Sequence, residues 1–352
     1  MVIVLKISIN ILLCVLFFFS CSPKKDKGVV TYTDFPQEKE LKAETIVLDT
    51  AIFKFPFRVQ IERDRAVVMD LHNPDYYVHL FQYPGFQYLA SVGKRGDSPT
   101  DMLSIENIQY FEHAFWTLDS NKRELTGFLL SSSNDSLLRD EVVTLGEDVL
   151  RPLDFTIYND TTFIVPDYSG ENRFCWVNRK GKLLRKTGTI PTINEEALKN
   201  AKPALAQAWR SFIDYNPQNG ILVATTQLGE VLEIYNLKDN THVTLIGEHG
   251  EPKFKISEGY GIPTGILGFC DVQVTGNAIY AVFDGTTFKE LVQSQGKLPD
   301  GGKYIYVFSL KGEPLCKYTL DRHLNGIWVD EATKTIIGTD VNSDQPIVKF
   351  RF

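Results

Sequence analysis

The stretch Val67-Val68-Met69-Asp70 has a pattern that recurs along the chain: a short apolar run that ends in a polar turn residue. Apolar runs of this length, closed by a turn signal, are typical of buried β-strands. Successive copies end 49, 48, 59, 58 and 56 residues apart. The six copies end at Asp70, Asp119, Asp167, Thr226, Asp284 and Asp340.

Two other elements accompany this repeat. Downstream of most copies a further strand ends in a turn where Gly or Asp supplies the positive φ of a hairpin, at residues 80–85, 176–181, 234–239 and 307–312. A link rich in glycine then leads to the next unit, with Gly93 and Gly96 in one copy and Gly247 and Gly250 in another. Each unit therefore consists of four strands and a link.

Four-stranded units that repeat every ~40–50 residues indicate a β-propeller. We therefore predict an all-β fold of six four-stranded antiparallel blades over residues 44–352. The sixth unit is one strand short, and we expect an N-terminal strand at residues 45–49 to close the ring and cover its edge. Two stacked sandwiches or a solenoid would not need that borrowed strand.

Two insertions interrupt the period. Residues 192–210 contain a helical pattern that is interrupted at Pro203, and residues 288–292 predict a second short helix. Functional loops concentrate in such links between strands. If a partner binds this protein, we expect it to contact these two links.

The N-terminus predicts an exported, lipid-anchored protein. Residues 2–19 are nearly all apolar, with one early cation, and end at Ser20 and Cys21, so residues 1–20 resemble a lipoprotein signal peptide with Cys21 as the acylated residue. Phe18 departs from the usual leucine, which leaves an uncleaved membrane anchor as the alternative. The polar residues that follow predict a flexible tether over 21–43, and Ser22 favours the outer membrane.

The net charge argues against one class of partner, and the cysteine content limits the number of disulfides. The net charge of −7 argues against nucleic-acid binding, which needs a basic face, and we expect a monomer. Outside the leader, Cys175, Cys270 and Cys316 permit at most one disulfide. Their unpatterned positions favour small apolar strand residues.

The stretch from Asp271 to the C-terminus resembles a known family. Residues 271–274, 279–285 and 305–308, with 311–315 and 317–321, are similar to the TolB-like six-bladed propeller lipoproteins common in gut Bacteroidetes, and residues 93–99 resemble their first link. The resemblance implies the propeller fold and a location in the cell envelope, on the periplasmic side or at the surface. It implies no active-site residue.

The chain has no motif for a catalytic serine, a nucleotide or zinc. We therefore expect no catalytic residue, no cofactor and no metal. The five strand-end aspartates (Asp70, Asp119, Asp167, Asp284, Asp340) could gather carboxylates for Ca²⁺ at the centre of the ring, but an aspartate there more often binds the N–H groups of its own turn. The main hypothesis is a non-enzymatic binding or scaffold lipoprotein for a protein or glycan. The alternative is a propeller hydrolase or lyase with a central, calcium-dependent site.

Overall fold

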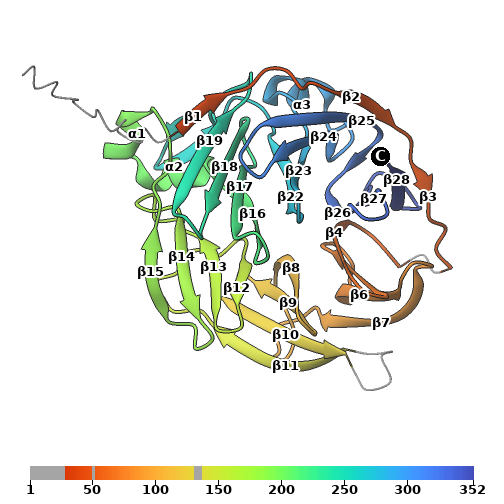
Figure 1. Ribbon diagram of the computed structural model, residues 1–352. Helices are drawn as coiled ribbons and strands as arrows, with labels where there is room; N and C mark the ends of the chain where they lie inside the picture. Colours follow the sequence, from red (N-terminus) through yellow and green to blue (C-terminus); the bar gives the residue numbers. More distant parts are fainter. Residues whose placement is uncertain (1–27, 50–51, 131–136) are drawn as a thin grey trace, which may run out of the picture.

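A computed structural model describes residues 28–49, 52–130 and 137–352. The predicted leader, Cys21 and the start of the tether lie outside these residues. The chain forms six β-sheets arranged as blades around a central axis (Figure 1). This confirms the predicted six-bladed propeller. Within the described residues, no helix has the length and apolarity needed to cross a membrane.

Each blade has four antiparallel strands that run in chain order from the axis outward, except that the outermost strand of blade 6 comes from the start of the chain. The first three blades are β4 (Pro56–Glu62), β5 (Arg65–Asp70), β6 (Tyr76–Gln82) and β7 (Gln87–Lys94); β8 (Ile105–Phe111), β9 (Ala114–Asp119), β10 (Glu124–Leu130) and β11 (Leu137–Thr144); β12 (Thr156–Asn159), β13 (Thr162–Pro166), β14 (Phe174–Asn178) and β15 (Leu183–Thr187).

The last three blades continue the order around the ring. They are β16 (Ser211–Asn216), β17 (Ile221–Thr226), β18 (Val231–Asn236) and β19 (Thr241–Ile246); β22 (Phe269–Val274), β23 (Ala278–Phe283), β24 (Gly302–Ser309) and β25 (Pro314–Leu324); β26 (Gly326–Asp330), β27 (Thr335–Thr339), β28 (Ile347–Arg351) and β3 (Glu44–Thr45).

The repeat found in the sequence is the second strand of every blade. β5, β9 and β17 end at the repeat's last residue, and β13, β23 and β27 end one residue before it. Because neighbouring strands are antiparallel, all second strands end on the face where the links between blades lie. We call this the link face, and the opposite side, where first strands turn into second strands, the hairpin face.

The N-terminal strand closes the ring as predicted, although it is shorter. β3 supplies the fourth strand of blade 6, with Thr45 opposite Val348 on β28, and the Ile46 N–H donates to the Ile347 carbonyl at 2.9 Å. Ile46 and Leu48 pack against the core between blades 6 and 1. Val47, in contrast, is exposed. The sixth blade is therefore complete only through the other end of the chain.

The predicted tether is wrong for residues 28–43, which are part of the folded ring. β1 (Gly28–Thr31) pairs in parallel with β19 of blade 4, and β2 (Glu38–Leu41) pairs in parallel with β25 of blade 5. Figure 1 shows this segment, in red and orange, running along the outer rim from blade 4 to blade 6. We call residues 28–45 the strap.

The strap holds because it carries large apolar side chains that fill gaps between blades. Tyr32 and Phe35 are buried between blades 4 and 5, where the Tyr32 ring lies 5.1 Å from Phe308 and the Phe35 ring 4.8 Å from Tyr306. Leu41 is buried against blade 5. The residues between these anchors are mostly polar, and the anchors do not recur with the period of a strand or a helix. The sequence pattern therefore does not reveal them.

The insertions lie on the link face. α1 (Glu195–Asn200) and α2 (Lys202–Ala208) join blades 3 and 4, and the chain breaks the helix at Ala201, just before Pro203. α3 (Phe288–Ser294) lies in blade 5 and starts with a Thr287–Glu290 capping box. The sequence pattern missed a hairpin between blades 4 and 5, formed by β20 (Phe254–Ser257) and β21 (Tyr260–Pro263).

If the strap is structural, removing one of its anchors should destabilise the whole ring. Phe35→Ala should lower the free energy of unfolding by about 3–5 kcal/mol, the usual cost for a buried phenylalanine. Val29→Ala, on the exposed side of the same strap, is the matched control and should change it little. Urea unfolding followed by circular dichroism measures both. Equal midpoints for the two variants would show that residues 28–43 are a tether after all.

Candidate functional site

The first strand of each blade has a sheet neighbour on one side only, so part of its backbone faces the central channel without a strand partner. Carboxylates from the preceding blade bind these N–H groups. Asp154 accepts from Ile213 N–H at 2.7 Å, Asp214 from Val274 N–H at 2.7 Å, and Asp271 from Ile327 N–H at 2.8 Å. Each bond connects one blade to the next around the axis.

Amide side chains extend the same arrangement. Gln273 on β22 accepts from the Val329 N–H of blade 6 at 2.6 Å. Asn107 on β8 donates its Nδ2 to the buried carboxylate of Asp154, which connects blade 2 to blade 3. These polar side chains of the channel are thus hydrogen-bonded to neighbouring blades.

Arg58 on β4 fills the channel from the first blade. Its guanidinium is 2% exposed, lies 3.2 Å from Asp271, and donates to the carbonyls of Asn325 and Cys270. The rings of Phe57 and Phe212 lie 4.1 and 4.4 Å from its Cζ atom. A buried charge is tolerated when it is paired and hydrogen-bonded, and here that pairing joins blades 1, 5 and 6.

The channel shifts the titration of its carboxylates. Desolvation raises the pKa of Asp154 and of Asp214 to about 7, despite the hydrogen bonds from N–H groups that favour the charged form. Desolvation also raises the pKa of Asp271, against the lowering effect of Arg58. Asp154 and Asp214 therefore change charge near neutral pH, where an ordinary aspartate does not.

The strand-end aspartates lie on the link face and bind their own turns, and two of them also bind the link before their blade. Asp70 accepts from the N–H groups of Lys54, Phe55, His72 and Asn73; Asp119 from those of Leu103, Asn121 and Lys122; Asp167 from Ser169; Asp284 from Thr286; Asp340 from Asn342. The structure therefore spreads them around the ring in separate turns. In the described part of the chain, no three His, Cys, Asp or Glu side chains are grouped to hold a metal ion.

The link glycines occupy two kinds of position. Gly93 and Gly250 have φ values of +68° and +75°, which favour glycine. At Gly96 and Gly247 a Cβ atom would collide with the carboxylates of Asp101 and Glu230. The three cysteines of the propeller are free thiols, with Cys175 and Cys316 buried in the blades and Cys270 half-buried.

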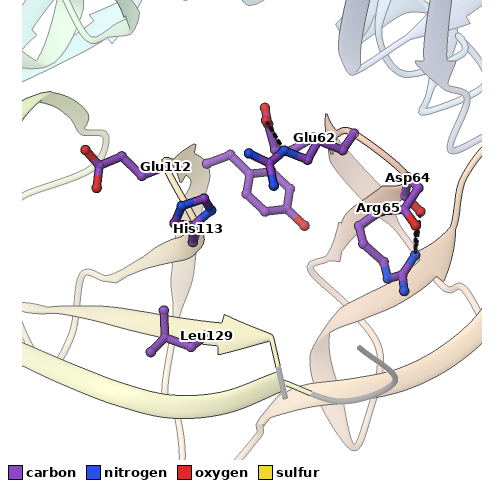
Figure 2. A pocket seen from close by; sticks show the side chains of 8 residues that line it. Glu62, Asp64, Arg65, Glu112, His113 and Leu129 are labelled. Atoms are coloured by element: carbon purple, nitrogen blue, oxygen red, sulfur yellow. Dashed lines mark hydrogen bonds and ion pairs between the residues drawn. The ribbon is translucent and has the colours of Figure 1, made fainter. Parts of the chain in front are cut away.

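A pocket of about 310 Å³ opens on the hairpin face between blades 1 and 2 (Figure 2). Four of its charged residues form two pairs: Arg65 lies 2.7 Å from Asp64, and Arg63 lies 3.7 Å from Glu62. Glu112 and His113 lie exposed on its other side. Because its guanidinium groups are paired with adjacent acids, this pocket is a weak candidate for a ligand site.

A cavity of about 260 Å³ lies where the channel opens on the link face, and we call it the funnel. Four phenylalanines contribute to its wall: Phe55, Phe57, Phe212 and Phe269. The polar lining comes from Gln227, Asp284, Asp300 and Asn325, and none of the described residues that line it is basic. These residues come from blades 1, 4, 5 and 6.

Two polar atoms in the funnel lack a partner in the described structure. The Nε2 of Gln227 and the Oδ1 of Asn325 are buried and make no hydrogen bond. The whole Asn325 residue is 7% exposed. An unsatisfied buried polar atom costs about 1–3 kcal/mol. Both residues line the funnel, but the two atoms themselves are buried, so a ligand can bond them only if these side chains turn toward the cavity.

Sequence reasoning missed the channel residues, although a signal exists. Arg58, Asn107, Asp154 and Asp271 each precede a strand-end aspartate by 12 or 13 residues, and polar and apolar residues alternate after three of them. The funnel has no such signal, because its residues come from separate turns far apart in the chain.

The chain was compared with known proteins. A family model described as TolB-like 6-blade propeller-like matches residues 34–332, whereas no curated protein matches the chain. Among solved structures, a Bacteroides fragilis protein inferred to be exported is similar at 9% identity and a TM-score of 0.57, over 92% of this chain and 98% of that one.

Two further Bacteroides structures are similar. A member of the DUF4221 family from Bacteroides vulgatus has 10% identity and a TM-score of 0.55, over 89% of this chain and 96% of that one. A protein from Bacteroides ovatus named an auxiliary nutrient binding protein has 12% identity and a TM-score of 0.52, over 85% and 69%. At these identities the likeness shows a shared fold.

The channel aspartates predict that stability falls as pH rises toward neutrality. Their pKa is about 7 in the folded protein and ~3.9 when unfolded, so the folded state binds more protons between these values and its advantage is lost as pH rises from about 4 to about 7. Buried His79, whose pKa is lowered to about 4, opposes part of this below pH 6.5. The melting temperature should decrease between about pH 5 and 7 and level off above that range.

The matched variant carries Asp154→Asn and Asp214→Asn, which keep the neutral shape without the titration. Its melting temperature should depend less on pH between about 5 and 7 than that of the wild type, because His79 is present in both proteins. Parallel curves for the two proteins would mean that these carboxylates are already ionised throughout.

Proposed function

The chain belongs to the TolB-like six-bladed propeller family, the family that its sequence suggested, and from this premise we propose that it is an exported, lipid-anchored binding protein whose funnel holds a small, neutral, hydroxyl-rich solute such as a sugar. The family establishes the fold but not the activity, because propellers host both binding and catalysis. The ligand class is argued from the funnel.

The unpaired amide groups of Gln227 and Asn325 carry the proposal. One offers a donor and the other an acceptor, and a hydroxyl group can satisfy both kinds of partner. The phenylalanine walls suit the apolar C–H face of a sugar ring, while the amides suit its polar edge. Sites with an apolar lining and a few placed polar groups are typical for small molecules.

Charge in the funnel favours a neutral ligand over an anion. Asp284 and Asp300 line the cavity, and the nearest buried cation, Arg58, is paired with Asp271. A carboxylate or phosphate would meet two acids without a free basic group. Sugar hydroxyls, in contrast, donate well to carboxylates.

The export part of the proposal rests on the leader and on Cys21. The Bacteroides fragilis protein inferred to be exported and the Bacteroides ovatus protein named for nutrient binding have the same fold. Their names are consistent with an extracytoplasmic binding role for this chain. A lipid anchor at Cys21 would keep such a binding protein at its membrane.

A second candidate function keeps the same site and adds hydrolysis. Burial raises the pKa of Asp284, and the charge of Asp300 raises it further. Glycoside hydrolysis uses a pair of carboxylates, one of which is kept protonated. Release of chromophore from aryl glycosides, lost in Asp284→Asn while sugar binding remains, would favour this candidate.

The proposal is tested by calorimetric titration of the purified protein with a panel of monosaccharides and disaccharides. We expect at least one to bind, and Gln227→Leu to weaken it about tenfold, since a lost hydrogen bond costs roughly 1–1.5 kcal/mol. Asn325→Leu should act in the same direction.

The control is Gln218→Leu, an exposed glutamine on the hairpin face, which should leave the affinity unchanged. If no member of the panel binds, or if binding is equal in all variants, the funnel is not a sugar site.

A further inference from the structure

The link face carries a raised cap over blade 4, formed by α1, α2 and the β20–β21 hairpin. Phe254 packs with Leu205, Trp209 and Ile246 in one cluster beneath the cap. Gly261 of the hairpin donates to Gln207 on α2 at 3.3 Å, and Glu251 accepts from Ile193 N–H at 3.1 Å. The hairpin is therefore held against the helices on one side.

The other face of the hairpin is exposed. In the register of the hairpin, Lys255 lies opposite Ile262 and Ser257 opposite Tyr260, so these four side chains share one face, whereas Ile256 lies on the face of Phe254. On the exposed face Tyr260 is 64% exposed and Ile262 50% exposed, and Ile193 before α1 is 88% exposed. We call these three apolar residues the cap patch.

The chain outside the described residues leads to this part of the ring. The description begins at Gly28, which lies beside Val243 on the outer strand of blade 4. Cys21 precedes Gly28 by seven residues, and a chain of that length spans at most about 25 Å. An acyl group on Cys21 would therefore hold the rim of blade 4 near the membrane, with blade 1 on the far side of the ring.

We propose that the cap patch docks on the lipid surface to which Cys21 is anchored, so that the propeller is held in a fixed orientation. The proposal rests on the proposed lipid anchor. Tyr260 and Ile262 would enter the interface between headgroups and acyl chains, where tyrosine is favoured.

The charges around the hairpin suit a lipid surface. Lys255 lies on its exposed face and Lys253 just before the hairpin, and both are exposed, as is one acid, Glu258, at the hairpin tip. Lysines beside apolar residues can reach anionic headgroups while their stems stay in the interface. Docking there would place the funnel mouth, which opens on the same face, close to the membrane.

The test places a tryptophan on the cap patch of the full, acylated protein. Ile262→Trp and the control Leu138→Trp, an exposed site on β11 of blade 2, are reconstituted into phosphatidylcholine–phosphatidylglycerol vesicles with brominated acyl chains. Bromine quenches only a tryptophan that enters the acyl region. The emission of the added tryptophan is obtained by subtracting that of the wild-type protein. Brominated lipid should lower it about twofold for Ile262→Trp and leave it unchanged for Leu138→Trp.

A second variant checks that the other patch residues take part. Adding Ile193→Ser and Tyr260→Ser to the Ile262→Trp protein should restore its emission, because the docked state loses two apolar side chains. Both added changes lie at exposed positions, so the fold should tolerate them.

Failure of the anchor and failure of docking give different results. A protein that is not acylated by intact mass and does not float with vesicles overturns both the anchor and the docking proposal. A protein that floats, with Ile262→Trp emission unaffected by brominated lipid, overturns docking alone and leaves the anchor standing. Quenching of Leu138→Trp to the same extent would also overturn it.

Discussion

The whole ring depends on how the inner edges of its blades are satisfied. Each first strand presents N–H groups to the channel, where no strand can pair with them, and an unpaired buried N–H group is costly. Asp154, Asp214 and Asp271 solve this by binding the first strand of the next blade. The same three bonds that satisfy the edge also fix the blades relative to each other.

The outer edges of the blades also present unpaired backbone groups, and the strap pairs with three of these edges. β1, β2 and β3 add strands to blades 4, 5 and 6, so three neighbouring edges are covered by one segment. The anchors Tyr32 and Phe35 fill the gap between blades 4 and 5. Ring closure is thus a contact between sequence ends that are about 300 residues apart, as the pair Thr45 and Val348 shows.

Local patterns predicted the parts of this fold that repeat. The run ending in Asp70 and its copies located the second strand of all six blades, because that strand is buried on both faces and, in five of the six, ends in an aspartate that binds the following turn. The strap escaped prediction because its few buried residues have no period. The funnel escaped for a different reason: Phe55, Gln227 and Asn325 meet only through the closed ring.

The account divides the polar residues near the axis into those that hold the ring and those that remain free in the funnel. Amide hydrogen exchange measured residue by residue tests this division most directly. The N–H groups of Ile213, Val274 and Ile327 should exchange slowly although they lie on sheet edges, and Asp214→Ala should release Val274 most strongly. Fast exchange of these three groups in the unmodified protein would contradict the account.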